Sequence, residues 1–326
     1  MDQTSANKAA LQINDFVFRH FDKLTVKDAI VVHDSPEAYI KTPVLLRSTK
    51  SLEEHIAYIR DHDVKKACVV AEDIRFLLQC PGLEYIQVYP SLTAESFDYS
   101  PLYDMPNLKW VSCKVEVGMK SRVVGSIDYS RIKGIQHLCV SGSQGHLNVE
   151  KAGSVTSLIF DFGYPKTADL RGMIPGKSLR SFSVNQAPIQ TLEGIQDAPQ
   201  LQRLELSNNR KLTDISALSS LKKSLRYLEI DTCGKIRDFS VLAELENLEY
   251  LILKGSNSIP NLLFLDDMPK LKYLHFTMNA ESGDLSPCLR LNYARIQNRK
   301  HYSHKDSDMP KAYTDPDEAY PFTQIQ

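Results

Sequence analysis

The stretch Leu201-Gln-Arg-Leu204-Glu-Leu206 decides the fold, because the same frame returns three more times further along the chain. The copies are Leu225-Arg-Tyr-Leu228-Glu-Ile230, Leu248-Glu-Tyr-Leu251-Ile-Leu253 and Leu271-Lys-Tyr-Leu274-His-Phe276. Weaker copies begin at Leu179, Val155, Ile135, Leu108 and Leu83, so successive copies start about 20 to 27 residues apart. This frame and period predict a leucine-rich repeat, in which each unit contributes one parallel strand and needs its neighbours to cover its apolar side.

The segments that connect the strands are also regular, with apolar residues three positions apart. The sets are Ile189, Leu192, Ile195 and Ala198; Leu212, Ile215, Leu218 and Leu221; Ile236, Phe239, Leu242 and Leu245; and Ile259, Leu262, Leu265 and Met268. Spacing by three suits short helical or 3₁₀ segments on the convex side of a curved sheet. The predicted fold is therefore an α/β leucine-rich repeat solenoid, with its repeat array at residues 63–280.

Residues 1–62 do not fit the repeat and are predicted to form an N-terminal α/β cap. Ser51 to Glu54 is a capping-box pattern that opens an expected helix, with Leu52, Ile56 and Ile59 on one side. The sequence 26–32 returns as a related VKxAxVV motif at 64–70, which indicates either a cap or a degenerate first repeat. Residues 281–326 are predicted to be a C-terminal cap followed by a polar tail.

Composition and charge narrow the classes of function. The 326 residues are 42% apolar, and 39 basic against 40 acidic side chains give a net charge of −1, so nucleic acid and anionic membranes are not expected partners. No export signal or membrane-spanning stretch is expected. The six cysteines lack CxxC or metal-type spacing, which favours buried free thiols. A cytoplasmic location is expected.

Strand positions three, five and seven should project from the concave face, because side chains alternate along a strand. The third position supplies Tyr85, Trp110, His137, Arg203, Tyr227, Tyr250 and Tyr273; the fifth supplies Glu205, Glu229 and His275; and the seventh supplies Asp231 and Lys254. Tyrosine and tryptophan are frequent at binding hot spots, so these solvent-facing residues are predicted to bind a protein partner. Stacking of the tyrosines between strands is the alternative, and the two roles are compatible.

The sequence contains no recognisable catalytic motif, so no enzyme activity and no cofactor are expected. His301 and His304 lack a third ligand at a suitable spacing, and no metal site is predicted. An enzyme with its site in the N-terminal region remains an alternative. Asp28, His33, Asp34 and Glu37 are close together there without forming a known motif.

The chain resembles the bacterial leucine-rich repeat proteins of the internalin type. Leu201-Gln-Arg-Leu-Glu-Leu-Ser-Asn-Asn209 and Leu212-Thr-Asp-Ile-Ser-Ala-Leu-Ser-Ser-Leu221 carry the resemblance, although the asparagine position varies as Asn209, Cys233, Ser256 and Asn279. The resemblance implies a curved binding scaffold, and we expect it to bind another protein without catalysis. One concrete version, by analogy with other repeat inhibitors, is an immunity or inhibitor protein. The alternative is a surface adhesion or recognition protein, and the oligomeric state is left open.

Overall fold

The computed structural model describes residues 29–33, 51–91, 94–117, 122–142 and 144–312. The chain divides into two compact units, Met1–Val155 and Thr156–Gln326, which are called unit 1 and unit 2. Both are built on parallel strands joined by 3₁₀ connectors, so the predicted leucine-rich repeat solenoid is confirmed.

Unit 1 pairs its strands in chain order. They are β1 (Ala29–His33), β2 (Lys66–Ala71), β3 (Tyr85–Pro90), β4 (Trp110–Lys114) and β8 (His137–Ser141). The helix α2 (Leu52–Asp61) begins at the predicted capping box, where the Glu54 amide donates to Ser51 Oγ and the Ser51 amide donates to Glu54 Oε2. β1 pairs with β2 in the related motifs, but Ala29 lies opposite Lys66 rather than Ala67.

Smaller elements complete unit 1. They are the 3₁₀ segments η1 (Arg75–Gln79), η2 (Ser100–Asp104), η3 (Tyr129–Arg131) and η4 (Val149–Lys151), the antiparallel pair β5 (Glu116–Val117) and β6 (Arg122–Val123), and the parallel pair β7 (Ile127–Asp128) and β9 (His146–Leu147).

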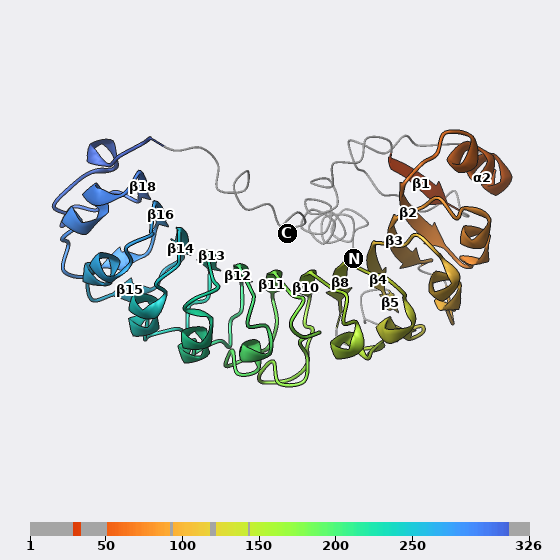
Figure 1. Ribbon diagram of the computed structural model, residues 1–326, viewed down its shortest axis with the longest axis horizontal. Coiled ribbons are helices and arrows are strands. Elements are labelled where there is room, and N and C mark those ends of the chain that lie inside the picture. The colour runs from red at the N-terminus through yellow and green to blue at the C-terminus, as the bar shows by residue number, and fades with distance from the viewer. Residues whose placement is uncertain (1–28, 34–50, 92–93, 118–121, 143, 313–326) are drawn as a thin grey trace, which may run out of the picture. The chain divides into compact units, whose positions relative to one another are not determined.

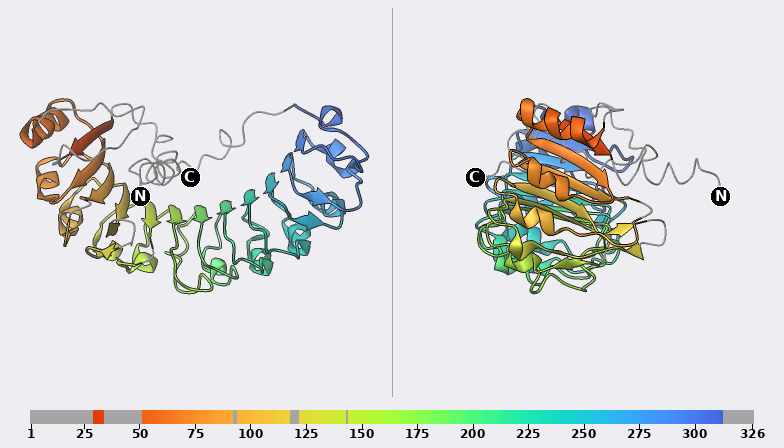
Figure 2. Two further views of the ribbon diagram at one scale, coloured as in Figure 1. Left: turned by 180° about the vertical axis from the view of Figure 1, so that it is seen from behind. Right: turned by 90° about the vertical axis from the view of Figure 1, so that its right-hand side faces the viewer.

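Unit 2 continues the same plan with more regular repeats (Figure 1). Its main strands are β10 (Ser157–Asp161), β11 (Ser181–Asn185), β12 (Arg203–Ser207), β13 (Tyr227–Asp231), β14 (Tyr250–Lys254), β16 (Tyr273–Phe276) and β18 (Tyr293–Ile296). Their connectors carry η5 (Ile195–Asp197), η6 (Ser216–Leu221), η7 (Ser240–Glu244), η8 (Leu263–Asp267) and η9 (Ser286–Arg290). These 3₁₀ segments lie on one side of the strands of unit 2 in both Figure 1 and Figure 2, which leaves the other sheet face without connectors. That face is called the open face.

The core of unit 2 lies between strands and connectors, because strand positions one, four and six point inward. Leu201, Leu204 and Leu206 are fully buried, as are the connector residues Leu212 and Leu218. Each repeat can bury these side chains only against the next repeat, so the sheet and the connector layer form together.

Buried polar side chains in several turns of unit 2 tie one repeat to the repeat before it. Asn209 Nδ2 donates to the Val184 carbonyl at 2.8 Å, and the Ala187 amide donates to Asn209 Oδ1 at 2.9 Å. One repeat later Cys233 Sγ donates to the Leu206 carbonyl at 3.5 Å, and in the following repeat the buried Asn257 donates to the carbonyls of Cys233 and Ile236. The frame assigned the position to Ser256, which is exposed. The buried amide of this repeat belongs instead to the next residue, Asn257, which follows Gly255 with φ 131° by two positions.

Strand pairing extends past residue 280. β18 pairs with β16, and Lys311 then forms an antiparallel bridge with Tyr293. Nearby lie β15 (Ser258–Ile259), β17 (Asn279–Ala280) and η10 (Asp306–Asp308). His301 Nε2 contacts the Ala280 carbonyl at 3.0 Å, so the segment around the two histidines packs against the last repeats.

Candidate partner-binding surface

The third strand position of unit 2 forms a continuous aromatic row of Tyr227, Tyr250, Tyr273 and Tyr293. The parallel register places each ring beside the next. The ring centroids are 6.4, 5.8 and 4.8 Å apart along the row, and the rings of the last pair are stacked and nearly parallel, with an interplanar angle of 5°. These rings lie on the open face and form an apolar cluster with Ile252.

A cation stands at each end of the aromatic row. Arg203 Cζ lies 3.7 Å from the centroid of the Tyr227 ring, and Lys311 Nζ lies 5.1 Å from that of Tyr293. Arg203 also donates from Nε to Glu205 Oε1 at 3.0 Å, so the buried guanidinium is paired as well as stacked. Cations over tyrosine faces are attracted by the ring quadrupole. Both ends of the row are therefore held by electrostatic contacts.

The prediction that these aromatics face solvent is wrong for most of them. Tyr227 and Tyr250 are 1% exposed, Tyr273 is 9% exposed, and Trp110 in unit 1 is 1% exposed. In unit 2 the physical reason is mutual coverage, because rings in adjacent parallel strands lie face to face and remove each other's surface from water. The aromatic row is therefore a mostly buried layer at the base of the open face.

Charged side chains of strand positions five and seven flank the aromatic row in unit 2. Glu229 Oε2 accepts from the Tyr227 hydroxyl at 2.9 Å, and its Oε1 accepts from Lys254 Nζ at 2.8 Å. Lys254 Nζ also lies 3.8 Å from Asp231 Oδ2. Although burial works against the ammonium, the carboxylates of Glu229 and Asp231 hold the pKa of Lys254 above its usual value. Hydrogen bonds and ion pairs thus connect the aromatic row with the charged side chains beside it.

His275 and Arg295 continue the fifth position beyond Ile252. Burial, together with the positive charges of Lys254 and Arg295, lowers the pKa of His275 to about 4. His275 is therefore neutral at pH 7, and Arg295 supplies the exposed positive charge of this column. The predicted contact residues do not include Tyr293, Arg295 or Lys311. The frame Leu291-Asn-Tyr293-Ala294-Arg295-Ile296 would have found Tyr293 and Arg295, since only Ala294 departs from the leucine pattern.

The predicted contact residues of unit 1 lie in one column of their own sheet. Tyr85 pairs with Trp110, and Trp110 pairs with His137. Tyr85 and His137 are half-buried, and burial lowers the pKa of His137 to about 4. The column continues to Lys66, which pairs with Tyr85 and is buried, so it combines aromatic groups, a neutral histidine and one buried cation.

The residues considered for chemistry give no assembled site. Asp28, Asp34 and Glu37 lie outside the described residues, as does the side chain of His33. Within the described ranges, no group of three or more His, Cys, Asp or Glu side chains could hold a metal ion. None of the described helices has the length and apolar character needed to cross a bilayer.

Comparisons with known proteins agree with the fold. A profile of leucine-rich repeats, taken as two copies, matches residues 199–244. An internalin (InlF) of Listeria monocytogenes is 18% identical and has a TM-score of 0.50, with 76% of this chain and 71% of that chain covered. Internalin C2 of the same species is 16% identical over 55% of this chain and 74% of its own, with a TM-score of 0.40. The mouse RP105/MD-1 complex is 10% identical over 72% and 42% of the two chains, with a TM-score of 0.44.

No curated protein matches the chain. The InlF similarity shows a shared fold, and the repeat profile agrees with a leucine-rich repeat solenoid.

Proposed function

We propose that this chain is a non-catalytic scaffold that binds one protein on the open face of unit 2. The observation that carries the proposal is the aromatic row with a cation at each end, bonded to the charged side chains beside it. A solenoid sheet offers an extended, preformed surface, which is the usual binding site of repeat proteins.

Rigidity favours binding here because little side-chain entropy is lost on association. Glu229 is already fixed by the Tyr227 hydroxyl and by Lys254, and neighbouring rings restrict Tyr250 and Tyr273. Immobilising a free side chain on binding costs about 0.5–1.5 kcal/mol, and groups that are ordered beforehand avoid most of this cost.

The charge pattern favours a protein over nucleic acid. Two carboxylates, Glu229 and Asp231, lie beside Lys254 on the open face of unit 2, and Arg295 lies two strands further along, beside His275. A nucleic-acid strand requires a groove of one positive sign along its backbone. A protein can present complementary charges of both signs, which fix register and reject other partners.

The finer proposal is an immunity or inhibitor protein that sequesters a toxin or an enzyme, in the bacterial cytoplasm. The six cysteines support a reducing compartment, because all are buried and none forms a disulfide. Surface adhesion or recognition is the second version, favoured by the internalin-type repeat. Fractionation of cells distinguishes them, since an inhibitor would be recovered with the cytoplasm and an adhesin with the envelope.

The test exchanges charges on the open face without changing the net charge. We expect Asp231→Arg combined with Arg295→Glu to lose partner capture in a pull-down from the source organism's lysate, quantified by mass spectrometry. A loss of about 2 kcal/mol, the hot-spot scale, corresponds to roughly thirtyfold weaker binding.

The matched control is Lys223→Glu with Asp267→Lys, an equal exchange at two exposed residues of the connector side. The control should retain the partner that the wild type captures. Equal capture by both variants would place the interface elsewhere.

A further inference from the structure

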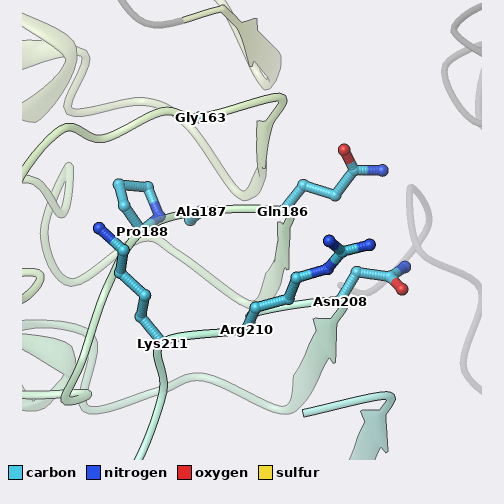
Figure 3. A pocket seen from close by; sticks show the side chains of 7 residues that line it. All are labelled: Gly163, Gln186, Ala187, Pro188, Asn208, Arg210 and Lys211. Atoms are coloured by element: carbon cyan, nitrogen blue, oxygen red, sulfur yellow. The ribbon is translucent and has the colours of Figure 1, made fainter. Parts of the chain in front are cut away.

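A pocket of about 420 Å³ opens at the ends of β10, β11 and β12 in unit 2 (Figure 3). The residues that line it follow three consecutive strands. They are Gly163, Gln186, Ala187, Pro188, Asn208, Arg210 and Lys211. The pocket therefore belongs to the rim of the sheet, apart from the aromatic row.

The backbone of the pocket is fixed by the repeat itself. Gln186 and Asn208 adopt left-handed conformations with φ of 53° and 56°, which turn the chain out of each strand. Their amides donate to the carbonyls of Ser207 and Asp231 at 3.0 and 2.9 Å, and Asn209 holds the amide of Ala187. The side chains of Gln186 and Asn208 consequently project from a rigid turn.

The polar groups of the pocket carry positive charge without a local counter-charge. Arg210 and Lys211 are exposed, and no carboxylate lines the pocket. The ion pairs described in unit 2 use other cations, namely Arg171, Arg203, Arg226, Lys254, Lys272, Arg290 and Lys311. Figure 3 shows the Arg210 side chain extending beside those of Gln186 and Asn208, while Lys211 extends toward Pro188.

The arrangement is specific to this repeat. In the next repeat the positions of Asn208 and Arg210 are occupied by Thr232 and Gly234, and only Lys235 keeps the charge of Lys211. The core and the turn hydrogen bonds do not require an arginine here, because the next repeat folds with glycine in the same place. Arg210 is therefore available for a ligand.

We propose that this rim pocket binds a phosphate monoester. A guanidinium can donate two parallel hydrogen bonds to phosphate oxygens, an ammonium acts as a compact positive charge, and side-chain amides donate further bonds. Arg210 would supply the paired hydrogen bonds to a phosphate dianion, and Lys211, which Figure 3 shows on the opposite side of the pocket, adds positive potential. A volume of about 420 Å³ also leaves room for the group that the phosphate esterifies. The proposal is independent of the partner on the open face.

The test is a titration of the full chain with O-phospho-L-serine at constant ionic strength, followed by backbone amide NMR signals. We expect saturable shifts at residues 186–188 and 208–211, with no saturation by L-serine and weaker binding of inorganic phosphate. Arg210→Ala combined with Lys211→Ala should weaken binding at least about tenfold, and Arg210→Lys should weaken it measurably because the fork is lost.

The matched control is Lys222→Ala with Lys223→Ala, which removes the same charge from two exposed residues of the connector side. This control should change the affinity by less than about twofold, since distant surface charges are screened. The proposal is overturned by equal weakening in the control, by the absence of saturation up to about 10 mM ligand, or by inorganic phosphate binding as tightly as the ester.

Discussion

Replacing Tyr250 with alanine tests whether the aromatic row stabilises unit 2. Tyr250 is 1% exposed and lies between Tyr227 and Tyr273, at centroid distances of 6.4 and 5.8 Å. Truncating a buried aromatic side chain to alanine costs about 3–5 kcal/mol. Within that sum, each aromatic contact contributes about 0.5–1.5 kcal/mol beyond buried area, so the two contacts account for about 1–3 kcal/mol.

The control is Tyr250→Phe, which keeps the ring and removes only the hydroxyl. Its expected cost is at most about 1.5 kcal/mol, the net value of one hydrogen bond. The assay is urea unfolding followed by far-UV circular dichroism. Fluorescence of the single tryptophan, Trp110, reports separately on unit 1. Equal free energies of unfolding for the alanine and phenylalanine variants would refute a stabilising role for the ring.

A double-mutant cycle isolates the contact between rings. Tyr250→Ala and Tyr273→Ala, alone and together, should show a coupling free energy of about 0.5–1.5 kcal/mol. Additive effects would mean that each ring is stabilised by burial alone. Because these rings are buried, alanine replacements are unsuitable for mapping the partner, and the charge exchange described above takes that role.

Three further predictions follow from individual contacts. Arg203→Ala should lower the free energy of unfolding by about 3–5 kcal/mol, because the partly buried carboxylate of Glu205 loses this ion-pair partner, whereas Arg203→Met with Glu205→Gln should recover part of the loss in the same urea assay. The free energy of unfolding should fall as the pH drops from about 6.5 toward 4. The cause is His275, whose pKa is lowered to about 4 in the folded chain, so that it takes up a proton more readily in the unfolded chain. His275→Gln should reduce this fall in calorimetric scans. Gly283→Ala should lower the free energy of unfolding by at least about 2 kcal/mol more than Gly172→Ala. Both glycines have φ near +70°, but only a Cβ at Gly283 would lie within 2.3 Å of a backbone oxygen. Chemical denaturation of the two variants measures the difference.

The sequence predicts the strands well because the repeat is encoded locally. Leucine at positions one, four and six sets the inward face, and the period-two alternation then sets the outward columns. The register follows, with Arg203 beside Tyr227 and Tyr227 beside Tyr250. The weaker frames at Leu83 and Leu108 form strands as well, since a strand requires only the apolar alternation and a paired neighbour.

The exposure of outward side chains could not be read from the repeat. Whether Tyr250 is exposed depends on which side chains occupy the same position in the two adjacent strands. Lys311 reaches Tyr293 because the chain folds back after the last strand, and such a contact has no periodic signal. Asn257 lies one residue after the frame position Ser256, so the repeat frame does not point to it.

In the proposed function, stacking of the aromatic rings fixes the side chains that the partner then contacts. The rings fix Tyr227, whose hydroxyl holds Glu229, and Glu229 in turn holds Lys254. A partner would therefore contact charges whose positions the buried row has set, and a change in the row would weaken binding through Glu229. The phosphate pocket needs no such support, because its turn is fixed by Asn209. Tyr250→Leu should therefore weaken partner capture while leaving the binding of O-phospho-L-serine within about twofold.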